Sequence, residues 1–189
     1  MVLLAKEQVE VKLTPQEIVE KTTIADVYRA VKNLDGVIYK TKLIYSDYFS
    51  NLSHNDIYIK PENLQKTGSF KLRGAYNCIS QLSEEQKAHG VIAASAGNHA
   101  QGVAYAAQQL GVKAVIVMPA TTPLLKVEAT RAYGAEVVLS GDSFDDAAAK
   151  AVELQQEFNY TFIHPFNDIE VILGQGTTAL EIIDDLKRC

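Results

Sequence analysis

Lys71 is the residue of this chain whose surroundings best suit covalent chemistry. It lies in the run Ser69-Phe-Lys-Leu-Arg-Gly74, within a helix predicted over residues 69–82, and so falls in that helix's first turn. The positive end of the helix dipole and partial desolvation both disfavour the ammonium form, which leaves the amine available to form an imine with a carbonyl cofactor. A lysine taken alone is usually a solvated surface residue. The apolar neighbour Phe70 and the tight turn Thr67-Gly-Ser69 favour the catalytic interpretation here.

The loop Ser95-Ala-Gly-Asn-His99 is the second candidate, between a predicted strand and a predicted helix. Backbone N–H groups at a helix N-terminus form an anion nest, so a carboxylate or a phosphate would fit there. Val103 and Ala104 stand where a phosphate-binding P-loop has Lys and Ser or Thr, which excludes that motif. The alternative is an ordinary strand-to-helix turn that uses Gly97 for a positive φ.

The remaining motifs are weak. The run Gly174-Gln-Gly-Thr-Thr-Ala179 loosely matches a dinucleotide fingerprint, but its preceding strand is poor, and we expect a glycine turn that leads into an amphipathic helix. The histidines show no metal-ligand spacing, so no metal site is predicted. Asp145 and Asp146 begin a predicted helix, where acidic residues cap the helix and interact favourably with the positive end of its dipole. No Ser/His/Asp triad can be assembled by spacing.

Composition narrows the function further. The 189 residues carry a formal charge of -5 and no cluster of Lys and Arg, which argues against nucleic acid and membrane surfaces as partners. No apolar run approaches the roughly 20 residues that span a bilayer, and Met1–Ala5 is too short for the core of a signal peptide. We therefore expect a cytoplasmic protein that acts on small molecules. Its two cysteines, Cys78 and Cys189, are expected to be reduced thiols.

The elements that must position these residues alternate regularly from residue 90 onward. Strands and helices joined by short links imply parallel strands with right-handed crossovers, buried on both faces by helices. Ligands of such sheets lie beyond the carboxyl ends of the strands, where residues 95–98 would be. The predicted strands are 91–95, 114–118, 136–139 and 161–163, and the predicted helices are 99–110, 123–133 and one from Asp142 or Ser143 to about 158.

The N-terminal part is less regular. Thr14-Pro-Gln-Glu17 offers a helix cap, and a second helix start at Thr22 or Thr23 leads into an apolar stripe expected to join the core. The stripe comprises Ile24, Val27, Tyr28 and Val31. Residues 56–60 alternate as a strand, which Pro61 ends.

Three stretches together resemble the serine/threonine dehydratases of the tryptophan synthase β-like family, also called fold type II pyridoxal phosphate enzymes. The threonine ammonia-lyases (threonine deaminases) are the nearest in kind. The resemblance extends from about residue 22 to the end of the chain. The stretches are Ser69-Phe-Lys-Leu-Arg-Gly-Ala75, Ser95-Ala-Gly-Asn-His-Ala-Gln-Gly102 and Gly174-Gln-Gly-Thr177.

By this resemblance, Lys71 would hold pyridoxal 5'-phosphate as an imine, Phe70 would line its ring and Asn98 would hydrogen-bond its phenolic oxygen. The loop residues Ser95, Ala96, Gly97, Asn98 and His99 would hold the substrate carboxylate. The implied reaction is β-elimination of L-threonine or L-serine to a 2-oxo acid and ammonia, within amino-acid metabolism and isoleucine biosynthesis. The two substrates differ by one methyl group, worth only about 1–3 kcal/mol in a pocket, so both remain candidates.

Ala96 favours elimination over racemisation, because racemases of the family carry there a serine that moves a proton, which a methyl group cannot do. Sulfhydrylase relatives have a different loop, Thr-Ser-Gly-Asn-Thr-Gly. The family's glycine-rich phosphate loop and the residue facing the pyridine nitrogen are not found, and Thr41-Lys-Leu43 replaces the usual Thr-Pro-Leu. The alternative expectation is therefore a truncated, catalytically incomplete fragment.

The resemblance also implies a domain organisation. Residues 1–88 would be the first part of a larger cofactor-binding domain, 89–168 a small α/β domain, and 169–189 the start of the second, incomplete part of the larger domain. The fold class is then α/β, with three-layer parallel sheets covered by helices on both faces. The full-length parent is expected to be a homo-oligomer.

Overall fold

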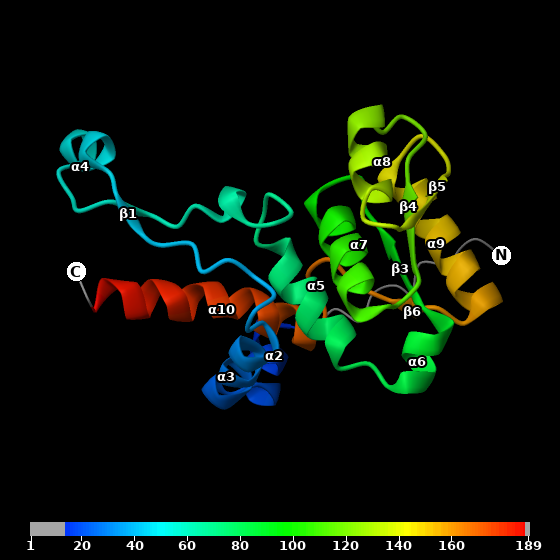
Figure 1. The fold of residues 1–189 in the computed structure, drawn as a ribbon, viewed down its shortest axis with the longest axis horizontal. Coiled ribbons are helices and arrows are strands. Elements are labelled where there is room, and N and C mark those ends of the chain that lie inside the picture. Colours follow the sequence, from blue (N-terminus) through cyan, green and yellow to red (C-terminus); the bar gives the residue numbers. More distant parts are fainter. Residues whose placement is uncertain (1–13, 188–189) are drawn as a thin grey trace.

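The computed structural model describes residues 14–187, so Cys189 and the N-terminal segment 1–13 lie outside the described residues. Helices and one short hairpin come first, and strands then alternate with helices (Figure 1). The elements before residue 90 are α2 (Pro15–Lys21), α3 (Ile24–Asn33), β1 (Ile44–Tyr45), α4 (Asp47–Ser53), β2 (Tyr58–Ile59), the 3-10 helix η1 (Glu62–Leu64), α5 (Lys71–Ser80) and α6 (Glu84–His89). The later elements are β3 (Val91–Ala94), α7 (Asn98–Leu110), β4 (Ala114–Met118), α8 (Leu124–Arg131), β5 (Glu136–Leu139), α9 (Phe144–Phe158), β6 (Thr161–Phe162) and α10 (Ile169–Leu186).

The strands β3 to β6 form one parallel sheet in the order β5-β4-β3-β6. Helices α7 and α8 lie on one side of this sheet and α9 on the other (Figure 1). The α/β prediction of parallel strands with helices on both faces is therefore confirmed. Local signals place the elements well: Gly111 ends α7 in the left-handed conformation, and Ser143 and Asp146 form the capping box of α9.

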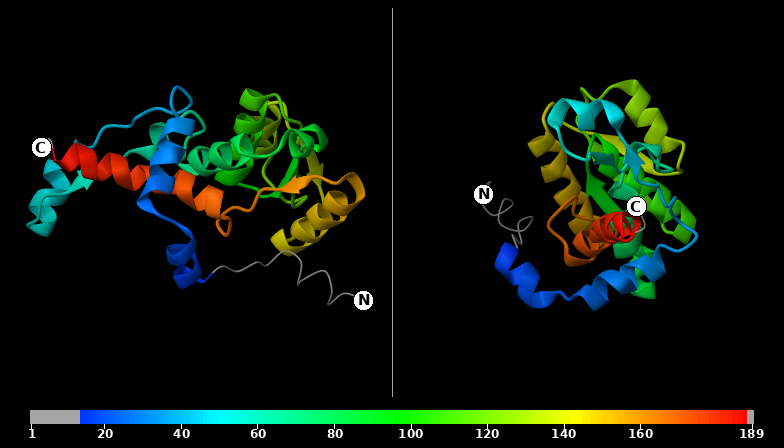
Figure 2. Two further views of the ribbon diagram at one scale, coloured as in Figure 1. Left: turned by 90° about the horizontal axis from the view of Figure 1, so that it is seen from below. Right: turned by 90° about the vertical axis from the view of Figure 1, so that its left-hand side faces the viewer.

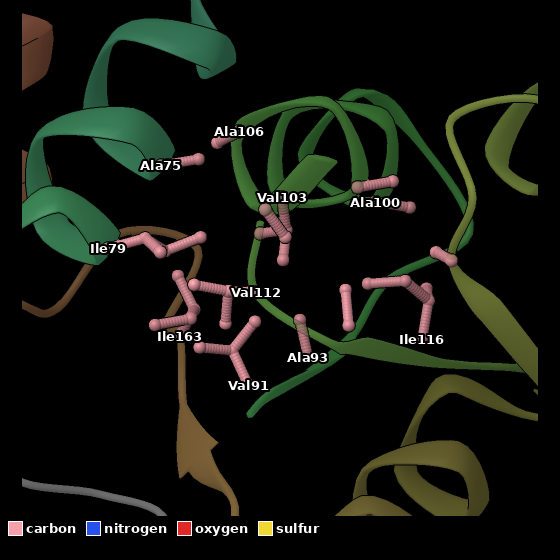
Figure 3. Packing of buried hydrophobic residues seen from close by; sticks show 14 of the residues in the cluster. Ala75, Ile79, Val91, Ala93, Ala100, Val103, Ala106, Val112, Ile116 and Ile163 are labelled. Atoms are coloured by element: carbon pink, nitrogen blue, oxygen red, sulfur yellow. The ribbon is translucent and has the colours of Figure 1, made fainter. Parts of the chain in front are cut away.

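The core follows the alternation of side chains along β3. Val91 and Ala93 pack with α7, as Figure 3 shows, whereas Ile92 and Ala94 pack with α9 on the other face. Strands β3 and β4 are thus buried on both faces, as expected. The same expectation is wrong for β5, where Glu136 and Leu139 are exposed, because β5 lies at the edge of the sheet.

Helix α10 corrects one sequence-based expectation. Gly174 and Gly176 were expected to form a turn, but they lie in the middle of a continuous helix that Asp168 caps. The glycine serves close packing: a Cβ on Gly174 would lie 2.5 Å from the carbonyl oxygen of Arg73 and 2.7 Å from the Cα of Gly74. A Cβ on Gly74 would likewise meet the carbonyl oxygen of Val171 at 2.7 Å. Helices α5 and α10 therefore cross in direct backbone contact.

Helix α3 corrects another. Its N-terminus is as predicted, with Thr23 and Asp26 forming a capping box, but only part of the apolar stripe is covered: Val27 and Val31 are half-buried. Ile24 and Tyr28 are 61% and 53% exposed, since α3 covers α10 with only one edge. Figure 2 shows α3 lying across the side of α10.

The predicted strand 56–60 is shorter than expected. Tyr58 and Ile59 pair antiparallel with Tyr45 and Ile44, and α4 forms the unpredicted connection between them. This hairpin lies away from the parallel sheet, near the end of α10 (Figure 1). Over residues 14–187, no helix combines the length and apolar content that crossing a membrane requires.

Candidate functional site

Lys71 begins α5 and lies close to α7. Gly102 of α7 makes this approach possible, because a Cβ there would lie 3.1 Å from the carbonyl carbon of Lys71 and 3.2 Å from the backbone nitrogen of Leu72. The Nζ of Lys71 donates a hydrogen bond of 2.7 Å to the carbonyl oxygen of Pro165, in the segment that follows β6. The predicted place of Lys71 in the first turn of a helix is confirmed.

The surroundings of Lys71 favour its neutral amine. The side chain is half-buried, and this burial lowers the pKa of Lys71 below its ordinary value. The nitrogen lies 5.5 Å from the centre of the Phe70 ring, which is itself 42% exposed and forms one wall beside the lysine. The result is a partly desolvated primary amine next to an aromatic face that a flat ligand can reach.

The loop 95–97 joins the carboxyl end of β3 to α7. Ser95 is tied to β4 by its N–H, which donates to Val117, while its hydroxyl oxygen accepts the N–H of Gly97. Among the described side chains none caps α7, so the N–H groups of its first turn, from Asn98 onward, are free to bind an anion. Gly97 has φ -138°, so the alternative expectation of a positive φ is wrong. Within residues 14–187, a Cβ on Gly97 would meet no atom within 4 Å, which leaves open space in front of the loop.

His99 is used differently from its neighbours. Its side chain is 3% exposed, and Nε2 lies 2.9 Å from the carbonyl oxygen of Ile163. Nε2 therefore carries the hydrogen, and Nδ1 is a buried acceptor for which residues 14–187 supply no donor. The imidazole fixes the segment after β6, so only the backbone N–H of His99 remains for a substrate carboxylate.

His99 is expected to make the fold sensitive to mild acid. Burial lowers the pKa of His99 to about 4, and the hydrogen bond with Ile163 opposes this shift. The unfolded chain binds this proton below about pH 6.5, so the free energy of unfolding should fall by about 3 kcal/mol between pH 6.5 and pH 4. Urea titrations at several pH values measure this slope. His99→Gln should flatten it, whereas His54→Asn, at an exposed histidine, should not; equal slopes in wild type and His99→Gln would contradict the assignment.

The strand order explains why these groups meet. From β3 the chain runs outward through β4 to β5, and α9 then returns it to β6 on the other side of β3. The sheet therefore has its switch point between β3 and β6, where ligands of parallel sheets bind. Lys71, the loop 95–97 and Pro165 lie together at this point. Sequence reasoning missed Pro165, because the place of β6 depends on strand order, which spacing does not reveal.

Comparisons with known proteins agree with this geometry. Residues 34–188 match the family described as "Pyridoxal-phosphate dependent enzyme". An L-threonine ammonia-lyase of Thermotoga maritima is 54% identical over 87% of this chain and 41% of its own length. Threonine deaminase isoform 2 of Solanum lycopersicum has 44% identity and a TM-score of 0.81, over 88% of this chain and 47% of that one. Maize serine racemase has 34% identity and a TM-score of 0.85, over 88% of this chain and 50% of that one. The chain spans half or less of the length of these three proteins.

Proposed function

Because the chain belongs to the family of pyridoxal-phosphate dependent enzymes, we propose that it serves the β-elimination of L-threonine, or alternatively L-serine, to a 2-oxo acid and ammonia. The observation that carries the proposal is the half-buried Lys71 amine, whose pKa is lowered by burial, at the switch point of a parallel sheet. A lysine of this kind binds carbonyl cofactors covalently.

The residues around Lys71 suit pyridoxal 5'-phosphate. Lys71 would bind the cofactor carbonyl through Nζ, the Phe70 face would line the ring, and the exposed amide of Asn98 would donate to the phenolic oxygen. When bound, this cofactor supplies an electron sink for the bond broken at the substrate Cα.

The substrate carboxylate would lie at the N-terminus of α7. Residues 95–99 offer backbone N–H groups there, and the uncapped first turn supports this assignment. In its free form, the Lys71 amine would remove the proton from the substrate Cα, as its lowered pKa favours.

Ala96 supports elimination over racemisation. Its methyl group carries no proton that could be delivered to the opposite face of Cα, although the fold itself is shared with a serine racemase. Gain of racemisation in Ala96→Ser, with no racemisation in wild type, is the result this account expects. As part of the same proposal, the protein is cytoplasmic, acts in isoleucine biosynthesis and forms a homo-oligomer, and its domains divide at 88/89 and 168/169.

The test is covalent trapping. The purified chain is incubated with pyridoxal 5'-phosphate and reduced with borohydride, and the modified peptide is mapped by mass spectrometry. Modification confined to Lys71 supports the site, and deamination of threonine by a longer protein that contains this sequence supports the reaction. Scattered modification of many lysines would contradict a preformed site and favour the alternative of a catalytically incomplete fragment.

A further inference from the structure

Arg73 lies two residues after Lys71 and is completely buried. Every N–H of its guanidinium finds an acceptor. Nε and one Nη bond the two carboxylate oxygens of Glu62 at 2.9 and 2.8 Å, and both Nη atoms bond Glu181, at 2.7 and 2.9 Å. The remaining N–H donates to the hydroxyl of Thr177 at 3.1 Å. A guanidinium bonded in this way is fixed in position and in orientation.

The partners of Arg73 come from distant parts of the chain. Glu62 belongs to η1, just before the turn that leads to Lys71, whereas Thr177 and Glu181 belong to α10. The cluster continues outward, since Glu62 accepts from Thr41 and Glu181 pairs with Lys60 at 2.7 Å. The first turn of α5 is thus held between η1 and α10 by charged hydrogen bonds.

The charges of this cluster support one another. Burial alone would lower the pKa of Arg73, but its bonds to the two glutamates more than offset this, so that the pKa of Arg73 is raised. Burial likewise opposes ionisation of Glu62, and the bonds from Arg73 and Thr41 more than offset it, so that the pKa of Glu62 is lowered. Arg73 and Glu62 are therefore both charged in the folded protein.

Helix geometry connects Arg73 to the direction of Lys71. Two positions along an α-helix correspond to a rotation of about 200°, so side chains at 71 and 73 leave α5 on nearly opposite sides. With Arg73 fixed towards η1 and α10, Lys71 must point away from them, to the side where α7 and Pro165 lie. A change in the rotation of α5 would turn the lysine out of this environment.

We propose that Arg73 is a positioning residue, which orients the Lys71 side chain into the candidate site by fixing the rotation of α5 about its axis. The meaning of this role for catalysis rests on the proposed function. Stability alone does not explain the cluster, because a buried ion group often stabilises no more than well-packed apolar side chains of similar volume. What the cluster contributes is orientation, because the planar guanidinium of Arg73 bonds Glu62 on one side and Glu181 on the other.

The inference is tested on the cofactor-free chain by the pH profile of Lys71 acetylation. His99 interacts electrostatically with Lys71, and His164 interacts with His99. Trace acetic anhydride is therefore applied only above about pH 8, where an ordinary imidazole is neutral and does not change the charge near Lys71. Mass spectrometry follows Lys71 against the exposed Lys126 in the same sample. Arg73→Lys keeps the positive charge but loses the paired guanidinium hydrogen bonds. Lys71 should then become more exposed to water, and the midpoint pH of its labelling should shift upward because burial lowers its pKa.

Two further variants separate positioning from stability. Ile79→Ala removes a buried side chain from the same helix, outside the cluster, and should lower the free energy of unfolding without moving the Lys71 midpoint. Glu181→Gln is the milder change and serves as the test if Arg73→Lys does not fold. In this variant too, the midpoint of Lys71 acetylation should shift upward. An unchanged midpoint in the folded cluster variants, or an equal shift in Ile79→Ala, overturns the inference. Acetylation needs no cofactor, so this result is independent of whether pyridoxal phosphate binds.

Discussion

Lys71→Ala is expected to abolish borohydride-trapped attachment of pyridoxal 5'-phosphate. The variant removes the amine that lies half-buried beside the Phe70 ring at the switch point of the sheet. In a longer protein containing this sequence, deamination should also fall by at least about 10²–10⁴-fold, the usual contribution of a positioned acid or base. The fold should survive, because the loss of one hydrogen bond, to the carbonyl oxygen of Pro165, costs at most about 3 kcal/mol. Peptide mapping and urea titration measure the two effects.

Lys66→Ala is the matched control for this prediction. Lys66 lies five positions earlier and its nitrogen stands over the Tyr39 and Tyr105 rings, at 5.3 and 5.9 Å from their centres, not at the switch point. Its loss should leave the trapped label on Lys71. If another single lysine carried the trapped pyridoxal 5'-phosphate to the same extent in wild type and in Lys71→Ala, the assignment of Lys71 to the cofactor would be contradicted.

Gly174→Ala is expected to destabilise the fold by about 1–3 kcal/mol, the usual cost of overpacking a rigid contact. The added methyl group would lie 2.5 Å from the carbonyl oxygen of Arg73 and 2.7 Å from the Cα of Gly74, and backbone atoms cannot turn aside as a side chain can. The prediction runs against helix propensity, which alone would make alanine about 1 kcal/mol more favourable than glycine within α10. Urea titration gives the sign.

Gly176→Ala is the control, two positions away in the same helix. Among residues 14–187, a Cβ there would meet only the side chain of Val27, at an ordinary distance of 3.6 Å. Propensity should then dominate, and the variant should gain up to about 1 kcal/mol of unfolding free energy. If Gly174→Ala were stabilised as much as Gly176→Ala, the close crossing of α5 and α10 would be refuted.

Signals that act within a few residues could be read from the sequence. The strands 114–118 and 136–139 are where the apolar runs predict them, and the capping boxes at Thr14, Thr23 and Ser143 mark true helix starts. The lysine in the first turn of α5 and the loop that precedes α7 belong to this class, because caps, glycines and apolar periods are local chemistry.

Features that depend on distant partners could not be read in this way. Gly174 looks like a turn residue until α5 is known to cross α10 at that point. Tyr28 looks like core until α3 is seen to cover α10 with one edge. Arg73 belongs to the motif around the lysine, but its partner Glu181 lies 108 positions away in the sequence. These roles arise from packing geometry, which a single sequence does not encode in any short pattern.

The backbone contacts on both flanks of α5 determine how the reactive amine can travel. Gly102 brings α7 against the start of α5 on one side, and the pair Gly74 and Gly174 brings α10 against the other. Together with the hydrogen bonds of Arg73, which set the rotation of α5 about its axis, these contacts hold α5 in place. Any swing of the Lys71 nitrogen must then come from rotation about the bonds of its own side chain, and not from slow displacement of helices. The Lys71 nitrogen can therefore move away from the carbonyl oxygen of Pro165 and return to it without disturbing the packing of the helices.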